Sequence, residues 1–550
     1  MTRPILAAVA ALALVLPPLA AQEPPVDTLL VNGKVLSADD AFTIHQALAI
    51  RGDRIVALGA TAEIRKLAGS RTRVIDLQGR TVIPGLIDSH LHAIRAALSY
   101  STEVHWIGAP SLEEALGRLK DAARRRLPGA WLIVAGGWTE RQFAEARRPT
   151  QAELVAVAPD NPVYVQLGYG WALMTPKALD ALEIARDDDV PPGATLERDA
   201  SGRFTGAVAG PQSAIVALFD RLPKPTYEQK VEGTKRFFHE LNRLGITGAI
   251  DPGGNNMTPA EYEAIGEVWR RGEMTVRIAF SMGSQGTSRE FEELTQLTGL
   301  IPMGFGDSML RFSGLGERIT AAMYNNDNPT AGDKAAFEKI ALWAARRGMT
   351  ITVHWSNDAS VGHLLEVFER VNQQVPIAPL RWSIAHLHDA SAATLSRMKS
   401  LGVAWALQHA MYFNGDNVIR QRGPDAARRI PPVETARKLG VVIGAGTDAH
   451  RVASYNPFIA LQWLVDGRTV DGTPMRGSEE TPSRADALRM YTIGSAWLAH
   501  ADDRRGSLEV GKLADLAVLS KDYMTVPSDQ IGSIESVLTL LGGRIVYEQK

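Results

Sequence analysis

Two histidines close an apolar run near the start of the chain and offer a pair of metal ligands. Residues 81–87 lead through Asp88 and Ser89 into His90-Leu91-His92. If this run is a β-strand, residues i and i+2 point to the same face, and the two imidazoles lie side by side. In that arrangement they can hold one metal ion, provided that the rest of the chain supplies further ligands.

Further polar residues fall where predicted strands end. From about residue 236 onward, short apolar strands alternate with helical patterns. Repeated βα units of this kind indicate a parallel sheet buried on both faces, and several in series favour a TIM barrel. The carboxyl ends of barrel strands open onto one face, where the chemistry is done. We therefore expect His90 and His92 to meet four other strand-end residues there: Asp251, His354, His386 and Asp448.

Some of these residues allow a structural interpretation as well. Asp251 is equally suited to a turn, and Asp448 to the N-cap of a helix. Three histidines lie near the predicted ligands in the sequence and are candidates for supporting or substrate contacts: His388, His409 and His450.

The composition excludes several classes of protein. The chain has no Cys, so it has no disulfide, thiol nucleophile, iron–sulfur cluster or cysteine-type zinc site. Any metal must be held by His, Asp or Glu, whose donor atoms suit zinc or a similar divalent ion. The net charge of -2 gives no basic footprint for nucleic acid. No Gly-x-Ser-x-Gly motif supports a serine hydrolase.

The first 21 residues have the pattern of a secretory signal peptide. Arg3 precedes an apolar core at 5–16, and small residues follow at 20–21. The alternative is a membrane anchor, but the apolar core is shorter than the roughly 20 residues that span a bilayer, and Pro17 and Pro18 interrupt it. We expect cleavage near Ala21 and export to the periplasm or the medium, with no stable membrane anchor.

The two ends of the mature chain share a β-rich pattern. Residues 26–82 and 505–550 contain short strands separated by turn residues such as Asn32-Gly33. We expect both ends to build one small β domain, since closing them into one sheet leaves fewer exposed edges. The barrel would then span 83–504, with an insertion at about 106–235 that caps the site. Aromatic residues of the insertion are either core or substrate contacts.

Residues 83–92, Ile83-Pro84-Gly85-Leu86-Ile87-Asp88-Ser89-His90-Leu91-His92, resemble the first-strand motif of the metal-dependent amidohydrolase superfamily. His354, His386 and Asp448 fit its fifth, sixth and eighth strands, and residues 506–519 resemble the return to its small β domain. With the insertion and Gly206, the chain is most similar to the amidohydrolase family 3 branch. The resemblance implies an α/β fold, a distorted (β/α)₈ TIM barrel with a β-sandwich formed by both chain ends.

One departure from the superfamily concerns the number of metals. Many relatives carry a bridging lysine on the fourth strand, whereas residues 310–317 contain no Lys and end in Glu317. The simpler interpretation is one zinc held by His90, His92, His354 and Asp448, with His386 polarising the substrate or orienting the water. The alternative is a two-metal site that includes His386 as a ligand, with Glu317 in place of the lysine.

Together with these residues, the resemblance implies metal-dependent hydrolysis of carbon–nitrogen bonds other than peptide bonds. A bound divalent metal provides water with a pKa of about 7. Asp448 would act as general base and pass the proton to the leaving nitrogen of an amide or amidine, while His386 stabilises the oxyanion. The alternative is a non-catalytic periplasmic protein that binds a metal or a small ligand. The substrate would be a small molecule, and a homo-oligomer is compatible with the sequence.

Overall fold

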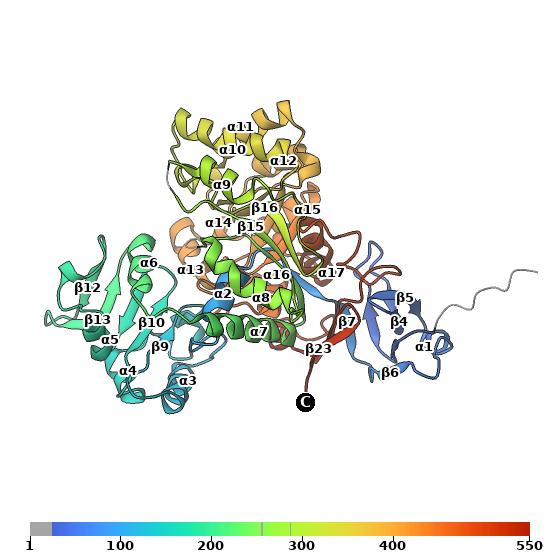
Figure 1. Cartoon of the computed structure of the whole chain (residues 1–550), viewed down its shortest axis with the longest axis horizontal. Coiled ribbons are helices and arrows are strands. Elements are labelled where there is room, and N and C mark those ends of the chain that lie inside the picture. Colours follow the sequence, from blue (N-terminus) through green and yellow to red (C-terminus); the bar gives the residue numbers. More distant parts are fainter. Residues whose placement is uncertain (1–24, 255–256, 287) are drawn as a thin grey trace, which may run out of the picture.

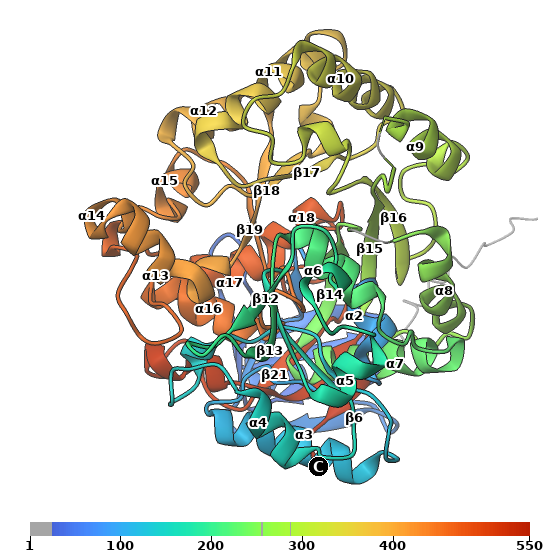
Figure 2. The ribbon, with the colours of Figure 1, turned by 90° about the vertical axis from the view of Figure 1, so that its left-hand side faces the viewer.

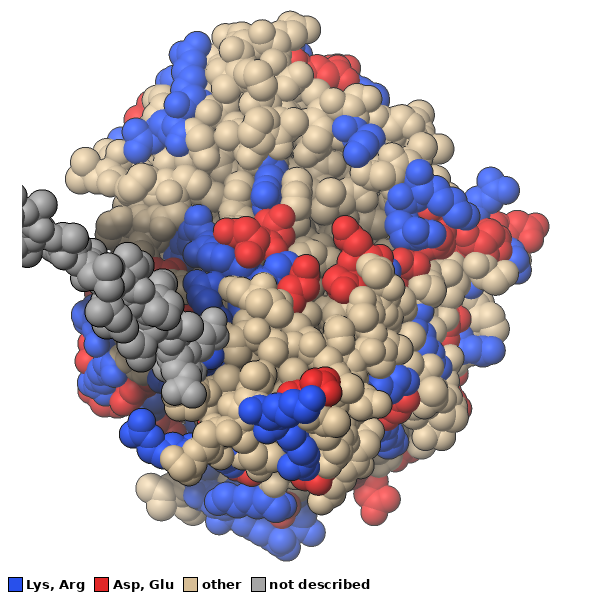
Figure 3. All heavy atoms as spheres, turned by 90° about the vertical axis from the view of Figure 1, so that its right-hand side faces the viewer, with Lys and Arg blue, Asp and Glu red and all other residues tan. Residues whose placement is uncertain are grey.

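A computed structural model describes residues 25–254, 257–286 and 288–550 (Figure 1). The predicted signal peptide lies outside the described residues. Within the described part, no helix is both long and apolar enough to cross a bilayer. On the face shown in Figure 3, Lys and Arg side chains are interspersed with Asp and Glu, in keeping with the small net charge.

The centre of the molecule is a parallel barrel, seen in Figure 2. Two four-stranded parallel sheets form it, with orders β16-β15-β14-β8 and β17-β18-β19-β20. The backbone of Leu315 hydrogen-bonds to Thr350 at one seam, and Ser89 to Ala445 at the other. The barrel prediction is confirmed, and its strands are β8 (Leu86–Asp88), β14 (Ile246–Asp251), β15 (Arg277–Met282), β16 (Leu310–Leu315), β17 (Thr352–Trp355), β18 (Ser383–His386), β19 (Ala404–Gln408) and β20 (Ile443–Gly446).

Helices cover the outside of the barrel and bury an apolar face against the strands. The main core contains large side chains from strands and helices alike, among them Phe237, Phe312 and Trp405. Side-chain caps fix where helices begin, as where Asn357 accepts a hydrogen bond from the Ala359 amide. The helices are α7 (Tyr227–Arg243), α8 (Glu263–Arg270), α9 (Glu290–Thr298), α10 (Ala331–Arg346), α11 (Asp358–Gln374), α12 (Ala392–Leu401), α13 (Ala410–Arg422), α15 (Val433–Lys438) and α16 (Pro457–Asp466).

Strands from both chain ends share one sheet beside the barrel. Its order is β23-β22-β21-β7-β2-β3, and a second sheet has the order β5-β4-β1-β6. Apolar residues of both sheets, including Leu30, Leu48 and Leu540, pack into one cluster. The strands are β1 (Thr28–Val31), β2 (Lys34–Leu36), β3 (Ile44–His45), β4 (Ala47–Arg51), β5 (Arg54–Gly59), β6 (Arg73–Asp76), β7 (Thr81–Pro84), β21 (Leu516–Leu519), β22 (Ser536–Leu541) and β23 (Arg544–Glu548).

The apolar run before His90 is divided between these two parts of the molecule. Strand β7 pairs with β21 in the shared sheet, whereas β8 pairs with β14 in the barrel. Gly85 separates them, and a Cβ atom there would lie 2.1 Å from Oγ1 of Thr247. Glycine permits this close approach because it has no side chain. The expectation of one continuous strand is therefore wrong.

The insertion forms a five-stranded sheet of its own, of order β12-β13-β11-β10-β9, to one side of the barrel (Figure 1). Trp138 is 3% exposed and stacks on Phe143, so this aromatic belongs to the core of the insertion. The elements are α3 (Leu112–Arg125), β9 (Leu132–Val134), α4 (Gln151–Val157), β10 (Val163–Leu167), β11 (Trp171–Met174), α5 (Pro176–Ala181), β12 (Thr195–Arg198), β13 (Phe204–Ala209) and α6 (Gln212–Asp220).

Candidate metal centre

His90 and His92 lie in the turn after β8, and α2 (Ala93–Tyr100) begins directly after His92. Both histidines are buried. Their ring centroids are 5.4 Å apart and the rings are nearly perpendicular, at 84°. The sequence alone suggested that the pleat of a strand brings the two imidazoles together. In the structure, a turn brings them together.

Asp88, the last residue of β8, holds this turn in place. Its Oδ1 accepts hydrogen bonds from the backbone amides of His90, at 3.0 Å, and Thr447, at 3.1 Å. Its Oδ2 accepts a hydrogen bond from the hydroxyl of Thr447 at 2.6 Å. Burial raises the pKa of Asp88 to about 6, against the effect of these hydrogen bonds. Asp88 thus joins the turn after the first barrel strand to the turn after the eighth.

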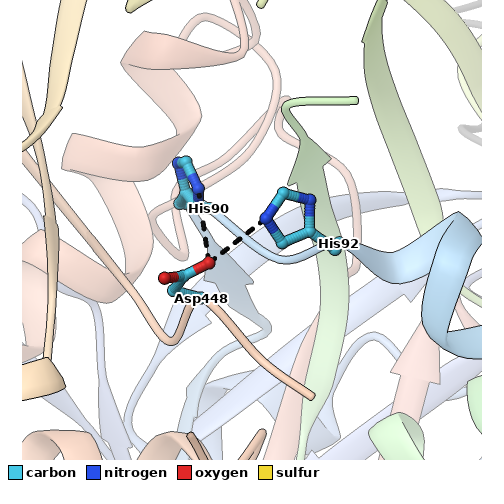
Figure 4. A group of neighbouring side chains, drawn as sticks. All are labelled: His90, His92 and Asp448. Carbon is cyan, nitrogen blue, oxygen red and sulfur yellow. Dashed lines mark ion pairs between the residues drawn. The ribbon is translucent and has the colours of Figure 1, made fainter. Parts of the chain in front are cut away.

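Asp448 follows β20 by two residues and faces the two histidines (Figure 4). Its Oδ1 lies 3.2 Å from Nε2 of His92 and 3.7 Å from Nε2 of His90. Its backbone amide donates to the carbonyl of His90 at 2.7 Å. Burial acts to raise the pKa of Asp448, but its hydrogen bond with His92 and the charges of His386 and His90 outweigh this and lower it to about 2.

Glu317, two residues after β16, occupies the middle of the histidine cluster. Its Oε2 lies 3.3 Å from Nε2 of His90 and 3.5 Å from Nε2 of His386, and its Oε1 lies 3.5 Å from Nε2 of His92. Burial opposes ionisation of this carboxyl, but the charge and hydrogen bond of His354 hold its pKa well below the usual range. A buried carboxylate thus lies within reach of all four histidines.

His354 and His386 come from the adjacent strands β17 and β18, with ring centroids 4.1 Å apart. Nδ1 of His354 lies 3.0 Å from Oε2 of Glu317. On its other side, Nε2 of His354 lies 2.9 Å from the amide nitrogen of Asn325. Burial and the charge of His354 lower the pKa of His386 to about 4, so His386 is neutral at pH 7.

The donor atoms of this cluster fit a divalent metal. Two sets have ligand atoms that all lie within 4.8 Å of one another: His90 with His92 and Asp448, and His90 with Glu317 and His386. Zinc bonds of about 2.0–2.1 Å in a tetrahedron place neighbouring ligands roughly 3.3 Å apart, close to the separations found here. In the described residues, Nε2 of His90 and Nε2 of His386 are buried without a hydrogen-bond partner. Such atoms are ready to coordinate an ion.

The other candidate residues from the sequence lie outside the ligand cluster. Asp251, at the end of β14, accepts hydrogen bonds from the amides of Ile94 and Gly253, so it supports the start of α2. His450 lies 3.2 Å from Glu103, which connects the loop after β20 with the start of the insertion. His388 lines the cavity beside His386, and His409 is buried near the same end of the barrel.

A cavity of about 870 Å³ opens onto the cluster from the side of His354, His386 and Asp448. Its walls come from the loops after the barrel strands, from α13 and from the insertion, and they include Trp138, Met411 and Phe413. A space of this size takes a drug-sized small molecule. The insertion therefore borders the cavity.

Sequence reasoning missed three polar residues near the cluster. Tyr324 stacks on His354 with ring centroids 4.3 Å apart, and Asn325 contacts the edge of the same ring, at Nε2, through the hydrogen bond above. Arg95, in α2, lies close to His92. No local pattern singles these residues out, because none of them occupies a strand end.

Comparison with known proteins agrees with this geometry. The model of the amidohydrolase family matches residues 73–547. The N-substituted formamide deformylase of Arthrobacter pascens is 24% identical over 95% of this chain and 98% of its own length.

Solved structures show the same fold. A metal-dependent hydrolase of Pyrococcus horikoshii superposes with a TM-score of 0.65 at 21% identity, covering 91% of this chain and 99% of its own. The atrazine chlorohydrolase TrzN of Arthrobacter aurescens, solved with zinc, superposes with a TM-score of 0.54 at 18% identity over 95% of both chains. None of these comparisons supports the non-catalytic alternative. The chain belongs to the amidohydrolase family and is a metal-dependent hydrolase of carbon–nitrogen bonds.

Proposed function

We propose that this enzyme hydrolyses an amide or amidine bond of a small molecule with Asp448 as the general base. One observation carries the proposal: Oδ1 of Asp448 lies 3.2 Å from Nε2 of His92, within a ligand cluster that faces the large cavity. The Asp448 side chain is 17% exposed, whereas that of His90 is fully buried. A carboxylate that belongs to the cluster and also faces the cavity can reach a substrate.

Two metal positions suit the donor atoms, and zinc is the metal that we propose. His90, His92 and Asp448 would hold the first ion. Nδ1 of His354 and Nε2 of His386 would hold the second, with Glu317 between the two sites. We favour this arrangement over the one-metal alternative because Glu317 lies within 3.5 Å of all four histidines. Bound zinc supplies an acidic water molecule and polarises the substrate carbonyl or amidine.

The protein's own groups then move the proton. Asp448 is ionised at neutral pH, since its pKa is about 2, and it accepts the proton of the attacking water. It delivers that proton to the nitrogen that leaves when the carbon–nitrogen bond breaks. Apolar and aromatic side chains such as Met411 and Phe413 surround the substituent and exclude water.

Two further features of the proposal concern the substrate and the location. The formamide deformylase, by its name, removes a formyl group from N-substituted formamides. We propose small N-substituted amides, formamides included, as the first compounds to test. We also propose export, because residues 1–21 have the charge and apolar pattern of a signal peptide.

The experiment is the substitution Asp448→Asn in zinc-loaded protein, assayed on a panel of formamides, amides, cyclic amides and amidines. The variant keeps most of its zinc, because the amide oxygen can still coordinate, but loses about 10²–10⁴ of kcat, the usual contribution of a general base. Asp307→Asn is the matched control and should keep the wild-type kcat. Asp307 lies in the loop before β16, whereas Glu317 lies after the other end of that strand. Wild-type turnover in Asp448→Asn would show that Asp448 is not the general base.

A further inference from the structure

A second cavity, of about 490 Å³, lies between the insertion and the barrel on the side of His92. Arg95 of α2 lines it, together with Tyr169 and Phe219 of the insertion. A Cβ atom at Gly254 would lie 3.1 Å from Nδ1 of His92 and 3.3 Å from Nη1 of Arg95. The guanidinium of Arg95 and the imidazole of His92 therefore border the same small space, and this cavity adjoins the metal centre.

Arg95 has no partner for its charge in the described part of the chain. Its Nε is buried without a hydrogen-bond acceptor, and no carboxylate forms an ion pair with its guanidinium. Arg95 is half-buried, and a cation that is partly withdrawn from water without an ion-pair partner is costly. Burial acts to lower the pKa of Arg95, but Tyr169, Asp448 and Glu317 attract its charge and raise it. Arg95 therefore stays charged.

Other side chains make this cavity cationic. Arg318 donates only to the backbone carbonyls of Ser284 and Gln285, and Lys230 forms no ion pair among the described residues. The acidic groups of the cavity are already engaged. Asp220 pairs with Lys224 at 2.9 Å, and Glu261 accepts a hydrogen bond from the amide of Thr258 at 3.1 Å.

We propose that Arg95 binds a carboxylate of the substrate, so that the enzyme acts on amides that carry an acidic group near the scissile bond. The guanidinium offers a planar pair of N–H donors that matches a carboxylate. With the scissile carbon at the metal centre, the acidic group points past Gly254 into the second cavity, where Arg318 and Lys230 add positive charge. This inference rests on the proposed hydrolase function and specifies the substrate class for that same site.

The test measures binding of phenylacetate to zinc-loaded protein by calorimetry at pH 7.5, with the neutral isostere 2-phenylethanol as reference. Wild type binds phenylacetate more tightly than 2-phenylethanol. Arg95→Gln weakens phenylacetate binding about 10- to 100-fold, the range for a charge-assisted pair, and leaves 2-phenylethanol unchanged. Arg95→Lys recovers only part of the loss, since an ammonium lacks the planar fork. Lys177→Gln, which removes a lysine that pairs with Asp160 and does not line this cavity, changes binding less than about twofold.

Stability separates a binding role from a structural one. Because Arg95 forms no hydrogen bond or ion pair among the described residues, Arg95→Gln should unfold close to the wild-type temperature in the absence of phenylacetate. A fall of several degrees would show that the guanidinium supports the fold, and the proposal would fail. Equal phenylacetate binding in Arg95→Gln and wild type would place the carboxylate on the metal and also overturn it.

Activity distinguishes this inference from the proposed function. N-formyl amino acids should be hydrolysed with a kcat/KM at least tenfold above that of their methyl esters, and Arg95→Gln should remove the difference. Equal hydrolysis of acids and esters refutes the role of Arg95 and leaves the hydrolase function intact. If zinc-loaded protein hydrolyses no member of either panel, the proposed amide and amidine substrates are wrong. Binding of phenylacetate then still decides whether Arg95 recognises a carboxylate.

Discussion

Oε2 of Glu317 lies 3.0 Å from Nδ1 of His354, and the two residues come from neighbouring strands of the barrel. The same oxygen lies 3.3 Å from Nε2 of His90, on the opposite side of the cluster. One buried carboxylate thus stands between the ligands of the two proposed metal positions. The number of bound ions should therefore depend on this residue.

Glu317→Gln should lower the zinc content from near two to about one ion per chain. The neutral amide keeps the size of the side chain but removes the charge that offsets a second cation. Elemental analysis of zinc-loaded, dialysed protein measures the change. Glu480→Gln replaces another buried glutamate, which accepts a hydrogen bond from the amide of Thr435. This variant should keep the wild-type zinc content. Two ions in Glu317→Gln would show that Glu317 does not hold the pair together.

Thr447→Val should destabilise the protein and loosen the first metal position. The substitution keeps the shape of the side chain but removes the hydroxyl that donates to Asp88 at 2.6 Å. Asp88 is fully buried, so the loss of this bond should cost about 1–3 kcal/mol in the free energy of unfolding. Denaturant unfolding measures that free energy, and zinc titration with a competing chelator measures the affinity.

Thr447→Ser provides the control for this prediction, because it retains the hydroxyl. Its unfolding free energy should lie closer to wild type than that of Thr447→Val. If the two variants are equally destabilised, the methyl group and not the hydrogen bond matters at this position.

Glu103 should make stability depend on acid pH. This buried carboxylate lies 2.8 Å from Nη1 of Arg451. Burial opposes its ionisation, but the charges of Arg451 and His450 outweigh this and hold its pKa below the ordinary value. Because the folded-state pKa is the lower one, the stabilisation is fully present above the unfolded pKa of roughly 4.3 and is lost as the pH falls further.

Glu103→Gln isolates this contribution. It leaves Arg451 without its partner, and breaking a buried pair costs about 3–5 kcal/mol in the free energy of unfolding. The difference between wild type and variant should be largest at pH 6–7 and should shrink below about pH 4, where the Glu103 carboxyl takes up a proton in the unfolded state but not yet in the folded state. Thermal unfolding across this range measures it, and a constant difference from pH 3 to 7 would contradict the pKa shift.

The sequence indicated the fold class and the residues at the centre. Alternating strands and helices predicted the barrel, which is confirmed, since hydrophobic period and strand-end position are local properties. His386 is the last residue of β18, as expected, while β17 continues one residue beyond His354 to Trp355. The structure brings His90, His92, His354, His386 and Asp448 together, although Asp251 supports α2 and does not join them.

Three features were decided only by the tertiary structure. Gly85 divides one apolar run between two sheets because Thr247, which is 162 positions further on, leaves no room for a side chain. Glu317 is one of many glutamates, and only the closed barrel places it among four histidines. Arg95 is one of many helical arginines, and only the packing of the insertion against the barrel gives it a cavity, where its Nε has no hydrogen-bond partner among the described residues. A sequence specifies which groups are present and their local periodicity, whereas their distances and burial depend on contacts between segments far apart in the chain.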